Sequence, residues 1–440
     1  MSDARSADRA AGESRTRAEE EIDGSNQAQE VVTGVTSCKA LSWKNLLIWR
    51  QNSGKIADMV KRYERRLQAP STSFFLFGMR GVGKTTWAYE HFAEARRIDL
   101  LREDLYQAHL VDPRLFRRQL ADLKSNDWVV VDEIQRLPAL LNEIHGLIQE
   151  RGLRFVLLGS SARKLRRAGV NLLGGRALQR TLSPFLPSET RHDYSLGDVL
   201  RFGSLPLIWN APSKRDQLEA YVQLYLKEEI QAEAIVRNLA GFARFLSVAS
   251  LFHGQILNVE GLARDSGVAR TTVQGYLDIL EDTLLAFRLR AFEGKLRVKE
   301  RRHPKLYWLD SGVVRAARKQ FHPPSPEERG SLFEGLIAQL LRAECALEPR
   351  LYDELYYWAV GKTALEVDFL LQRGDSFVAI EAKASERLAS TALSGLKAIA
   401  ELPNVERRIL VYCGEHRYHH ESGVEVLPFE DFLGELERGF

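Results

Sequence analysis

The chain has 440 residues, which at about 150 residues per domain predicts two to four domains. Hydrophobic residues make up 45% and charged residues 28%, values that exclude a fibrous or wholly disordered chain. The 62 Lys and Arg residues against 59 Asp and Glu leave a net charge of only +3, so any nucleic-acid surface must be a local patch.

The cysteines and the hydropathy pattern bear on the cellular compartment. Cys38, Cys345 and Cys413 lie far apart without C-x-x-C spacing, which argues against a disulfide framework or a zinc ribbon. No stretch approaches the roughly 20 apolar residues that span a bilayer, and the N-terminus lacks the apolar core of a signal peptide. We therefore expect a cytoplasmic protein with no membrane partner.

Composition and periodicity divide the chain into four segments. Residues 1–38 are rich in Ser, Ala, Arg and Glu and predict a disordered tail. In residues 39–190, buried strands alternate with helices, which predicts a parallel sheet that binds its ligand at the carboxyl edge of the strands. Residues 191–320 are mainly helical, and residues 321–440 show a second α/β pattern.

A phosphate-binding loop follows the first buried strand. The segment Gly78–Thr85 matches G-x-x-x-x-G-K-[ST] and stands between an apolar run and a helical segment. In such a loop, backbone N–H groups surround the phosphates, Lys84 neutralises the β- and γ-phosphates, and Thr85 ligates Mg²⁺. The sequence therefore predicts a site for ATP and Mg²⁺. The residues expected to contact the nucleotide are Gly78, Gly81, Val82, Gly83, Lys84, Thr85, Thr86, Asp132 and Ser160.

Two carboxylates follow the second buried strand. Asp132 stands where a Mg²⁺ ligand belongs, and Glu133 is placed to activate a water molecule. At the end of the third strand, Ser160 or Ser161 either hydrogen-bonds the γ-phosphate or caps a helix. With Glu133 as the base, the pattern predicts an enzyme that hydrolyses ATP as well as binding it.

Four segments carry a resemblance to a known family: Asp132–Gln135, Gly159–Arg176, Gly203–Pro206 and Lys305–Gly312. They resemble the AAA-type P-loop ATPases of bacteria and archaea that carry a C-terminal domain of unknown function with a restriction-endonuclease-like PD-(D/E)XK core. The resemblance covers nearly everything after the tail. It implies an α/β fold in which a P-loop NTPase parallel sheet is followed by a helical/winged-helix segment and a C-terminal restriction-endonuclease-like α/β domain.

The same resemblance implies an arginine that senses or stabilises the γ-phosphate. It assigns this catalytic role to Arg176, with Arg163 and Arg180 as alternatives. A surface ion pair is the other interpretation of Arg176. If the protein is a homo-oligomer, Arg176 acts on the nucleotide of a neighbouring subunit.

A helix–turn–helix pattern occupies Val259–Ala286. Arg270 and Thr271 begin its second helix, where a recognition helix meets DNA bases. A strand pair with a basic tip follows, and its basic residues are Arg288, Arg290, Lys295, Arg297, Lys299, Arg301, Arg302 and Lys305. Contact of Arg297, Lys299 and Arg301 with DNA phosphates is one interpretation. Packing of a winged helix against its own ATPase domain is the other.

The segment Glu366–Lys383 predicts a β-hairpin with a type II′ turn at Gly374–Asp375. In this register Asp368 lies opposite Glu381, and the charged residues share one face while the apolar residues share the other. Two carboxylates about 5 Å apart, with Lys383 beside them, suit a divalent metal ion and phosphodiester hydrolysis.

The hairpin also fits the D…(D/E)-x-K pattern of restriction-like nucleases. We expect Asp368, Glu381 and Lys383 to be catalytic if the domain cleaves DNA, and Glu334, Asp368 and Glu381 to bind the metal ion. An ordinary hairpin with exposed paired charges is the alternative. The sequence thus supports an ATPase coupled to DNA binding or cleavage, or a nucleotide-switched regulatory ATPase with a non-catalytic interaction module.

Overall fold

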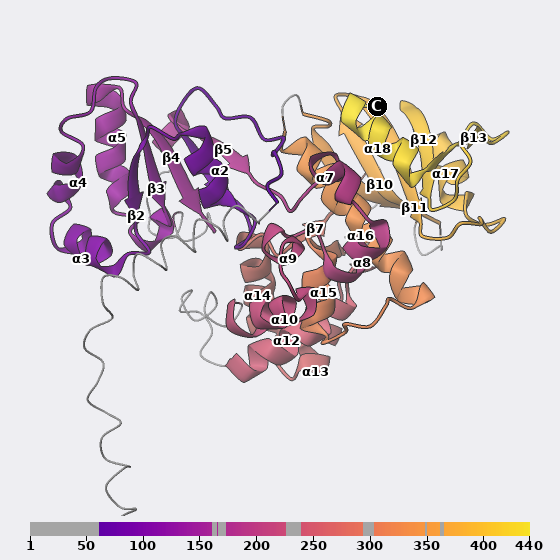
Figure 1. The fold of residues 1–440 in the computed structure, drawn as a ribbon. Coiled ribbons are helices and arrows are strands. Elements are labelled where there is room, and N and C mark those ends of the chain that lie inside the picture. The colour runs from indigo at the N-terminus through magenta and orange to yellow at the C-terminus, as the bar shows by residue number, and fades with distance from the viewer. Residues whose placement is uncertain are drawn as a thin grey trace, which may run out of the picture. The chain divides into compact units, whose positions relative to one another are not determined.

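A parallel five-stranded sheet forms the first part of the fold (Figure 1). The computed structural model describes residues 61–160, 165, 173–225, 239–293, 303–347, 350–360 and 365–440. The strands are β1 (Phe74–Phe77), β2 (Arg96–Asp99), β3 (Trp128–Asp132), β4 (Arg154–Gly159) and β5 (Leu178–Thr181), in the order β2-β3-β4-β1-β5. Every neighbouring pair is parallel, as predicted.

Several predicted residues lie outside the described ranges. They are the tail 1–38, Ser161, Arg163, Lys295, Arg297, Lys299, Arg301 and Arg302. The prediction of a basic tip between the two strands therefore stays a prediction. Within the described ranges, no helix is long and apolar enough to cross a membrane.

Helices cover both faces of the parallel sheet because its strands are apolar on both sides. Phe74 of β1 packs with Trp87 of α2 (Lys84–His91) on one face. Phe75, one residue further along, belongs to the core on the other face, which includes Ile144 of α5 (Leu140–Arg151). The other helices up to residue 193 are α3 (Glu103–Val111), α4 (Arg114–Gln119), η1 (Ile134–Arg136), η2 (Leu173–Gly175), α7 (Pro187–Thr190) and η3 (Arg191–Asp193).

The next part is mainly helical and includes a small antiparallel sheet. Its strands are β6 (Gln255–Ile256), β7 (Ala286–Leu289) and β8 (Lys305–Trp308), in the order β6-β8-β7. Its helices are α8 (Leu196–Phe202), α9 (Pro206–Trp209), α10 (Lys214–Ala220), η4 (Tyr221–Tyr225), α12 (Leu239–Leu251), α13 (Val259–Ser266), α14 (Arg270–Asp282) and α15 (Ser311–Ala317).

Helices α13 and α14 form the predicted helix–turn–helix. Gly267 ends α13 with a φ of 63°, a left-handed conformation that glycine adopts without strain. Val273 and Tyr276 of α14 are buried, whereas Arg270 and Thr271 are exposed as predicted. Arg270 forms an ion pair of 3.3 Å with Glu260 of α13.

The described basic residues of the strand pair are paired with carboxylates. Arg288 forms ion pairs with Asp278 and Glu281 of α14. Arg290 lies 3.2 Å from Glu354, and Lys305 is buried among carboxylates of the C-terminal domain. The acidic partners come from other elements of the fold, so counting charges along the strand pair could not reveal them.

Two segments that carried the family resemblance meet in space. Asp310 caps α15 by accepting a hydrogen bond from Val313 N, and its other oxygen accepts one from Ser204 N at 2.8 Å. Burial raises the pKa of Asp310 to about 6, although the backbone hydrogen bonds oppose this shift. Gly312, at the start of α15, lies directly against the carbonyl of Phe202.

A mixed six-stranded sheet forms the C-terminal domain. Its strands are β9 (Glu354–Ala359), β10 (Glu366–Arg373), β11 (Ser376–Lys383), β12 (Val405–Tyr412), β13 (Tyr418–His419) and β14 (Glu425–Pro428), in the order β13-β14-β12-β11-β10-β9. Its helices are α16 (Pro326–Cys345), α17 (Ser394–Ala398), η5 (Ile399–Glu401) and α18 (Phe429–Arg438). Residues of α16 and α18 join the core on one face of the sheet, and residues of α17 join the core on the other.

The hairpin register is confirmed, but its faces differ from the prediction. Phe369 pairs with Ile380 and Arg373 with Ser376 around a turn in which Gly374 has a φ of 57°. The pairing of β10 with β9 shifts between Val367 and Leu370. Because of this bulge, Asp368 reaches Lys305 on the same side on which Phe369 contacts Tyr307, so charged and apolar residues share that face.

The close approach of α15 to α8 makes Gly312 a sensitive position. A Cβ atom added at Gly312 would lie 2.0 Å from the carbonyl oxygen of Phe202, so we expect Gly312→Ala to lower the free energy of unfolding by about 1–3 kcal/mol. Nothing lies within 4 Å of a Cβ added at Gly275 inside α14, so Gly275→Ala should raise it by about 0.5–1 kcal/mol. Urea unfolding of both variants checks this, and equal midpoints would contradict the contact.

Candidate functional site

The P-loop connects β1 to α2 at the carboxyl edge of the parallel sheet. Gly81 and Gly83 have φ values of 75° and 91°, which side chains with a Cβ atom rarely adopt. A Cβ atom added at Gly78 would lie 2.6 Å from the carbonyl oxygen of Leu182. The glycines of the motif are therefore required by the course of the backbone.

Lys84 and Thr85 are held in place at the start of α2. The Lys84 Nζ donates hydrogen bonds to the carbonyl oxygens of Gly78, at 2.8 Å, and Met79, at 3.2 Å. The Thr85 hydroxyl donates to Asp132 Oδ2 at 2.7 Å. Lys84 is only 7% exposed, so water screens its charge weakly and its electrostatic interaction with a group bound in the loop would be strong.

Asp132 and Glu133 lie at the end of β3, where the sequence places them. Burial raises the pKa of Asp132, and the hydrogen bond from Thr85 opposes this shift. Glu133 has a φ of 56°, an unusual conformation for a residue with a side chain. Such conformations are found at active sites, where the surrounding contacts hold them.

Gln135 links Glu133 to the end of β4. Its side-chain amide donates hydrogen bonds to Glu133 Oε2 and, at 3.1 Å, to Ser160 Oγ. Gln135 and Ser160 are both buried. The sequence predicted Ser160 at this edge but missed the positioning role of Gln135, because a glutamine two residues after a carboxylate matches no general motif.

Residues outside the motif also hold the P-loop. Arg65 donates to Val82 O at 2.9 Å, Leu207 N donates to Gly81 O at 3.1 Å, and the Tyr221 hydroxyl donates to Arg80 O at 3.2 Å. These donors come from before the sheet and from the helical part after it. Because these donors have no fixed spacing from the motif, they could not be predicted from the sequence.

Arg176 does not reach the P-loop of its own chain. It lies two residues before β5, and Leu178 N donates to Ser73 O next to the start of β1. The P-loop follows the opposite end of β1. Because β1 has four residues and a strand rises about 3.3 Å per residue, the two ends of β1 are about 13 Å apart. The exposed Arg176 side chain lies instead beside Gln149 of α5. Arg180 lies further along β5, next to Leu76.

The P-loop region fits a magnesium–nucleotide complex. Thr85 and the adjacent buried Asp132 provide the hydroxyl and carboxylate oxygens that Mg²⁺ prefers, and phosphates would provide more. Lys84 and the backbone N–H groups of the loop would bind the phosphates. When bound, Mg²⁺ would neutralise charge that develops on the phosphate oxygens.

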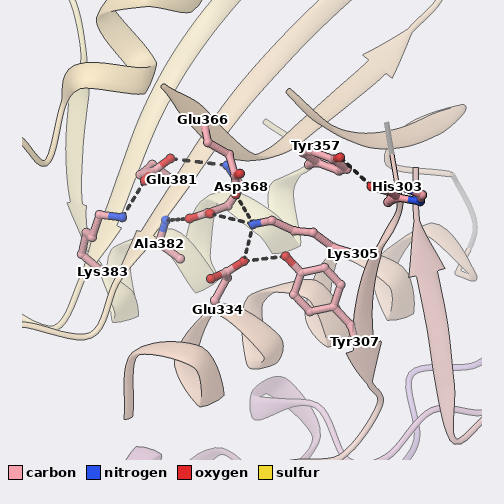
Figure 2. Close-up of polar contacts among 10 residues, drawn as sticks. All are labelled: His303, Lys305, Tyr307, Glu334, Tyr357, Glu366, Asp368, Glu381, Ala382 and Lys383. Carbon is pink, nitrogen blue, oxygen red and sulfur yellow. Dashed lines mark hydrogen bonds and ion pairs between the residues drawn. The ribbon is translucent and has the colours of Figure 1, made fainter. Parts of the chain in front are cut away.

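A second group of charges lies where β8, α16 and the β10–β11 hairpin meet (Figure 2). Four carboxylates and two lysines belong to it: Glu334, Glu366, Asp368, Glu381, Lys305 and Lys383. The predicted residues are therefore together, with Lys383 paired to Glu381 at 2.5 Å and Asp368 N donating to Glu381 Oε2 at 3.4 Å. The sequence missed the role of Lys305, which it grouped with the basic strand pair.

Lys305 occupies the middle of the carboxylates. Its Nζ lies 2.9 Å from Glu334 Oε1 and 3.3 Å from Asp368 Oδ1, and it also pairs with Glu366. Burial alone would lower the pKa of Lys305, but the surrounding carboxylates raise it well above its usual value, so the lysine is charged. Burial also raises the pKa values of Glu334 and Glu381, helped by the neighbouring Asp368.

In this arrangement the cluster does not fit a divalent metal ion. Its carboxylate oxygens face an ammonium group, and among the described residues no group of three or more His, Cys, Asp or Glu side chains could hold a metal. The predicted metal-binding role of Glu334, Asp368 and Glu381 thus gains no support here.

Three family models match successive parts of the chain. Residues 71–190 match an AAA domain, residues 194–323 match a domain of unknown function (DUF8612), and residues 329–432 match another (DUF4143). The first match and the parallel sheet with its P-loop support an AAA-type P-loop ATPase domain. The other two matches assign no activity.

The chain is also similar to whole proteins. The uncharacterized proteins Mb2031c of Mycobacterium bovis and Rv2008c of Mycobacterium tuberculosis are each 28% identical over 386 residues, which cover 86% of this chain and 84% of theirs. A structure of the Aeropyrum pernix ORC1 protein in complex with DNA is 14% identical, covers 63% of this chain and 92% of its own, and has a TM-score of 0.27. A TM-score this low supports no argument about function.

The position of Gln135 generates a test of the nucleotide site. We expect Gln135→Ala to lower the kcat for ATP hydrolysis by about 10- to 100-fold, because Glu133 loses the hydrogen bond that orients it. KM for ATP should change little, since the described hydrogen bonds of Gln135 go to Glu133 and Ser160 and not to the P-loop. Steady-state kinetics check this beside Gln107→Ala, an exposed glutamine on α3. A rise in KM with an unchanged kcat would contradict the positioning role.

Proposed function

We propose that the protein binds ATP with Mg²⁺ and hydrolyses it. The observation that carries this proposal is the arrangement at one sheet edge of Lys84, Thr85 and Asp132, with Glu133 held beside them by Gln135. The AAA domain match over residues 71–190 supports it. Lys84 would bind the phosphates, and Thr85 and Asp132 would hold Mg²⁺.

Hydrolysis needs a base that removes a proton from the attacking water. Glu133 is a carboxylate at this edge that is not bound to Thr85. The hydrogen bond from Gln135 to its Oε2 holds the side chain in place, and its other carboxylate oxygen would accept the proton. Ser160, which also accepts from Gln135, marks the place between β3 and β1 where the γ-phosphate would lie. Positioning and charge neutralisation then do most of the catalytic work.

Two variants separate binding from hydrolysis. Lys84→Ala should abolish both, because no other lysine of the motif replaces its charge. Glu133→Gln should lower the kcat by at least about 100-fold while ATP still binds, since it removes only the base. Phosphate release and binding of fluorescent ATP are the measurements.

Matched controls are Lys124→Ala and Glu94→Gln, two exposed residues outside the P-loop and the sheet edge. Full hydrolysis by Lys84→Ala, or unchanged hydrolysis by Glu133→Gln in folded protein, would rule out this active site. Activity that remains with both controls and disappears with both variants would support it.

We further propose that the helix–turn–helix binds DNA, with Arg270 and Thr271 at the start of α14 toward the bases. Their exposure supports this role. The pairing of Arg288 and Arg290 with carboxylates argues against a broad basic surface, so the contact area would be small. The alternative to DNA binding is a nucleotide-switched ATPase whose C-terminal domain is a non-catalytic interaction module. In a homo-oligomer, Arg176 would act on the nucleotide of a neighbouring subunit.

Salt dependence tests the DNA-binding proposal. Arg270→Glu should weaken retention of duplex DNA at every salt concentration and make log Kd less steep against log salt by about one to two units, because a phosphate contact becomes a repulsion. Fluorescence anisotropy measures both. Arg114→Glu on α4 is the control, since Arg114 is also exposed but lies outside the helix–turn–helix. If the parent, Arg270→Glu and Arg114→Glu have the same slope of log Kd against log salt, α14 does not contact the DNA.

A further inference from the structure

The carboxylates of the C-terminal domain are held by a cation that comes from another part of the chain. Lys305 lies on β8, in the three-stranded sheet after the helix–turn–helix, and points into the group formed by α16 and β10 (Figure 2). Its side chain is only 4% exposed, and its Nζ contacts Glu334, Glu366 and Asp368. One ammonium group therefore pairs with carboxylates of two elements at once.

Several further contacts keep Lys305 in this place. The hydroxyl of Tyr307, two residues along β8, donates to the same oxygen of Glu334 that Lys305 contacts, at 2.5 Å. The ring of Tyr357 lies 5.8 Å from the Lys305 Nζ, within range of a cation–π interaction. The Tyr357 hydroxyl donates to His303 O, which fixes the segment that leads into β8.

The carboxylate oxygens also have other protein donors. Asp368 Oδ1 faces Lys305, and Asp368 Oδ2 accepts from Ala382 N at 3.0 Å. The two oxygens of Glu381 contact Lys383 Nζ and Asp368 N. A divalent ion would need several of these oxygens at 2.0–2.6 Å from a single point, and it would also lie next to a fixed positive charge.

From these contacts we propose that Lys305 is the resident cation of this carboxylate cluster and takes the place of a divalent metal ion. The site is closed to metal while β8 keeps its present position beside α16. It opens to a divalent ion only when Lys305 is withdrawn or replaced. The proposal concerns Lys305 of β8 and the carboxylates of the C-terminal domain, and it does not depend on ATP hydrolysis at the P-loop.

Binding of Mn²⁺ to the full-length protein without nucleotide tests the proposal. The free Mn²⁺ signal in electron paramagnetic resonance counts the bound ions. Parent protein and Asp368→Asn should bind the same number of ions, because the parent has no metal at Asp368. Lys305→Met should bind one additional Mn²⁺, with an affinity at least about tenfold above any seen in the parent, and adding Asp368→Asn should remove it.

Lys305→Met leaves buried carboxylates without their cation and is expected to destabilise the fold. A second variant with balanced charges therefore keeps the test possible if Lys305→Met does not fold. Lys305→Met combined with Glu366→Gln removes one positive and one negative charge and keeps Glu334, Asp368 and Glu381. It should also gain the additional Mn²⁺. Lys397→Met, at an exposed position of α17, is the matched control and should behave like the parent.

Two results would overturn the proposal. The first is a Mn²⁺ ion bound by the parent and lost in Asp368→Asn, which would show that metal and Lys305 coexist. The second is folded Lys305→Met, or the double variant, that binds no more Mn²⁺ than the parent. ATP hydrolysis by the same preparations is measured in parallel, so a failure of the ATPase proposal would be seen separately.

Discussion

A charged side chain buried in protein must find an opposite charge or enough hydrogen bonds, and the P-loop region and the C-terminal carboxylate cluster both depend on that requirement. Lys84 is buried against two carbonyl oxygens, and Asp132 accepts from Thr85. Lys305 is buried against carboxylates that would otherwise repel one another. Backbone carbonyl oxygens hold the first lysine, whereas carboxylates balance the charge of the second.

The same requirement accounts for the partners of the basic residues on and next to β7 and β8. Arg288 pairs with residues of α14, Arg290 with β9, and Lys305 with α16 and β10. In each case a basic residue next to the predicted tip is used to attach one element to another. These pairings reduce the net positive charge around Arg288, Arg290 and Lys305.

The sequence predicts what depends on neighbours along the chain. The P-loop, the carboxylates at the end of β3 and the turn at Gly374 are short contiguous patterns, and the structure has each of them in its expected place. Arg65, Tyr221 and Lys305 contact residues more than fifteen positions away, and no spacing rule links them to their partners. The side of β10 on which Asp368 lies depends on a bulge that strict alternation cannot reveal.

The hydrogen bond from Leu207 N to Gly81 O has a consequence for how the loop is observed in solution. Its donor lies on α9, yet its acceptor is inside the phosphate-binding loop. An amide proton exchanges with solvent only when its hydrogen bond opens. The exchange rate of the Leu207 amide therefore reports on opening of the loop from a residue that itself carries no part of the nucleotide motif.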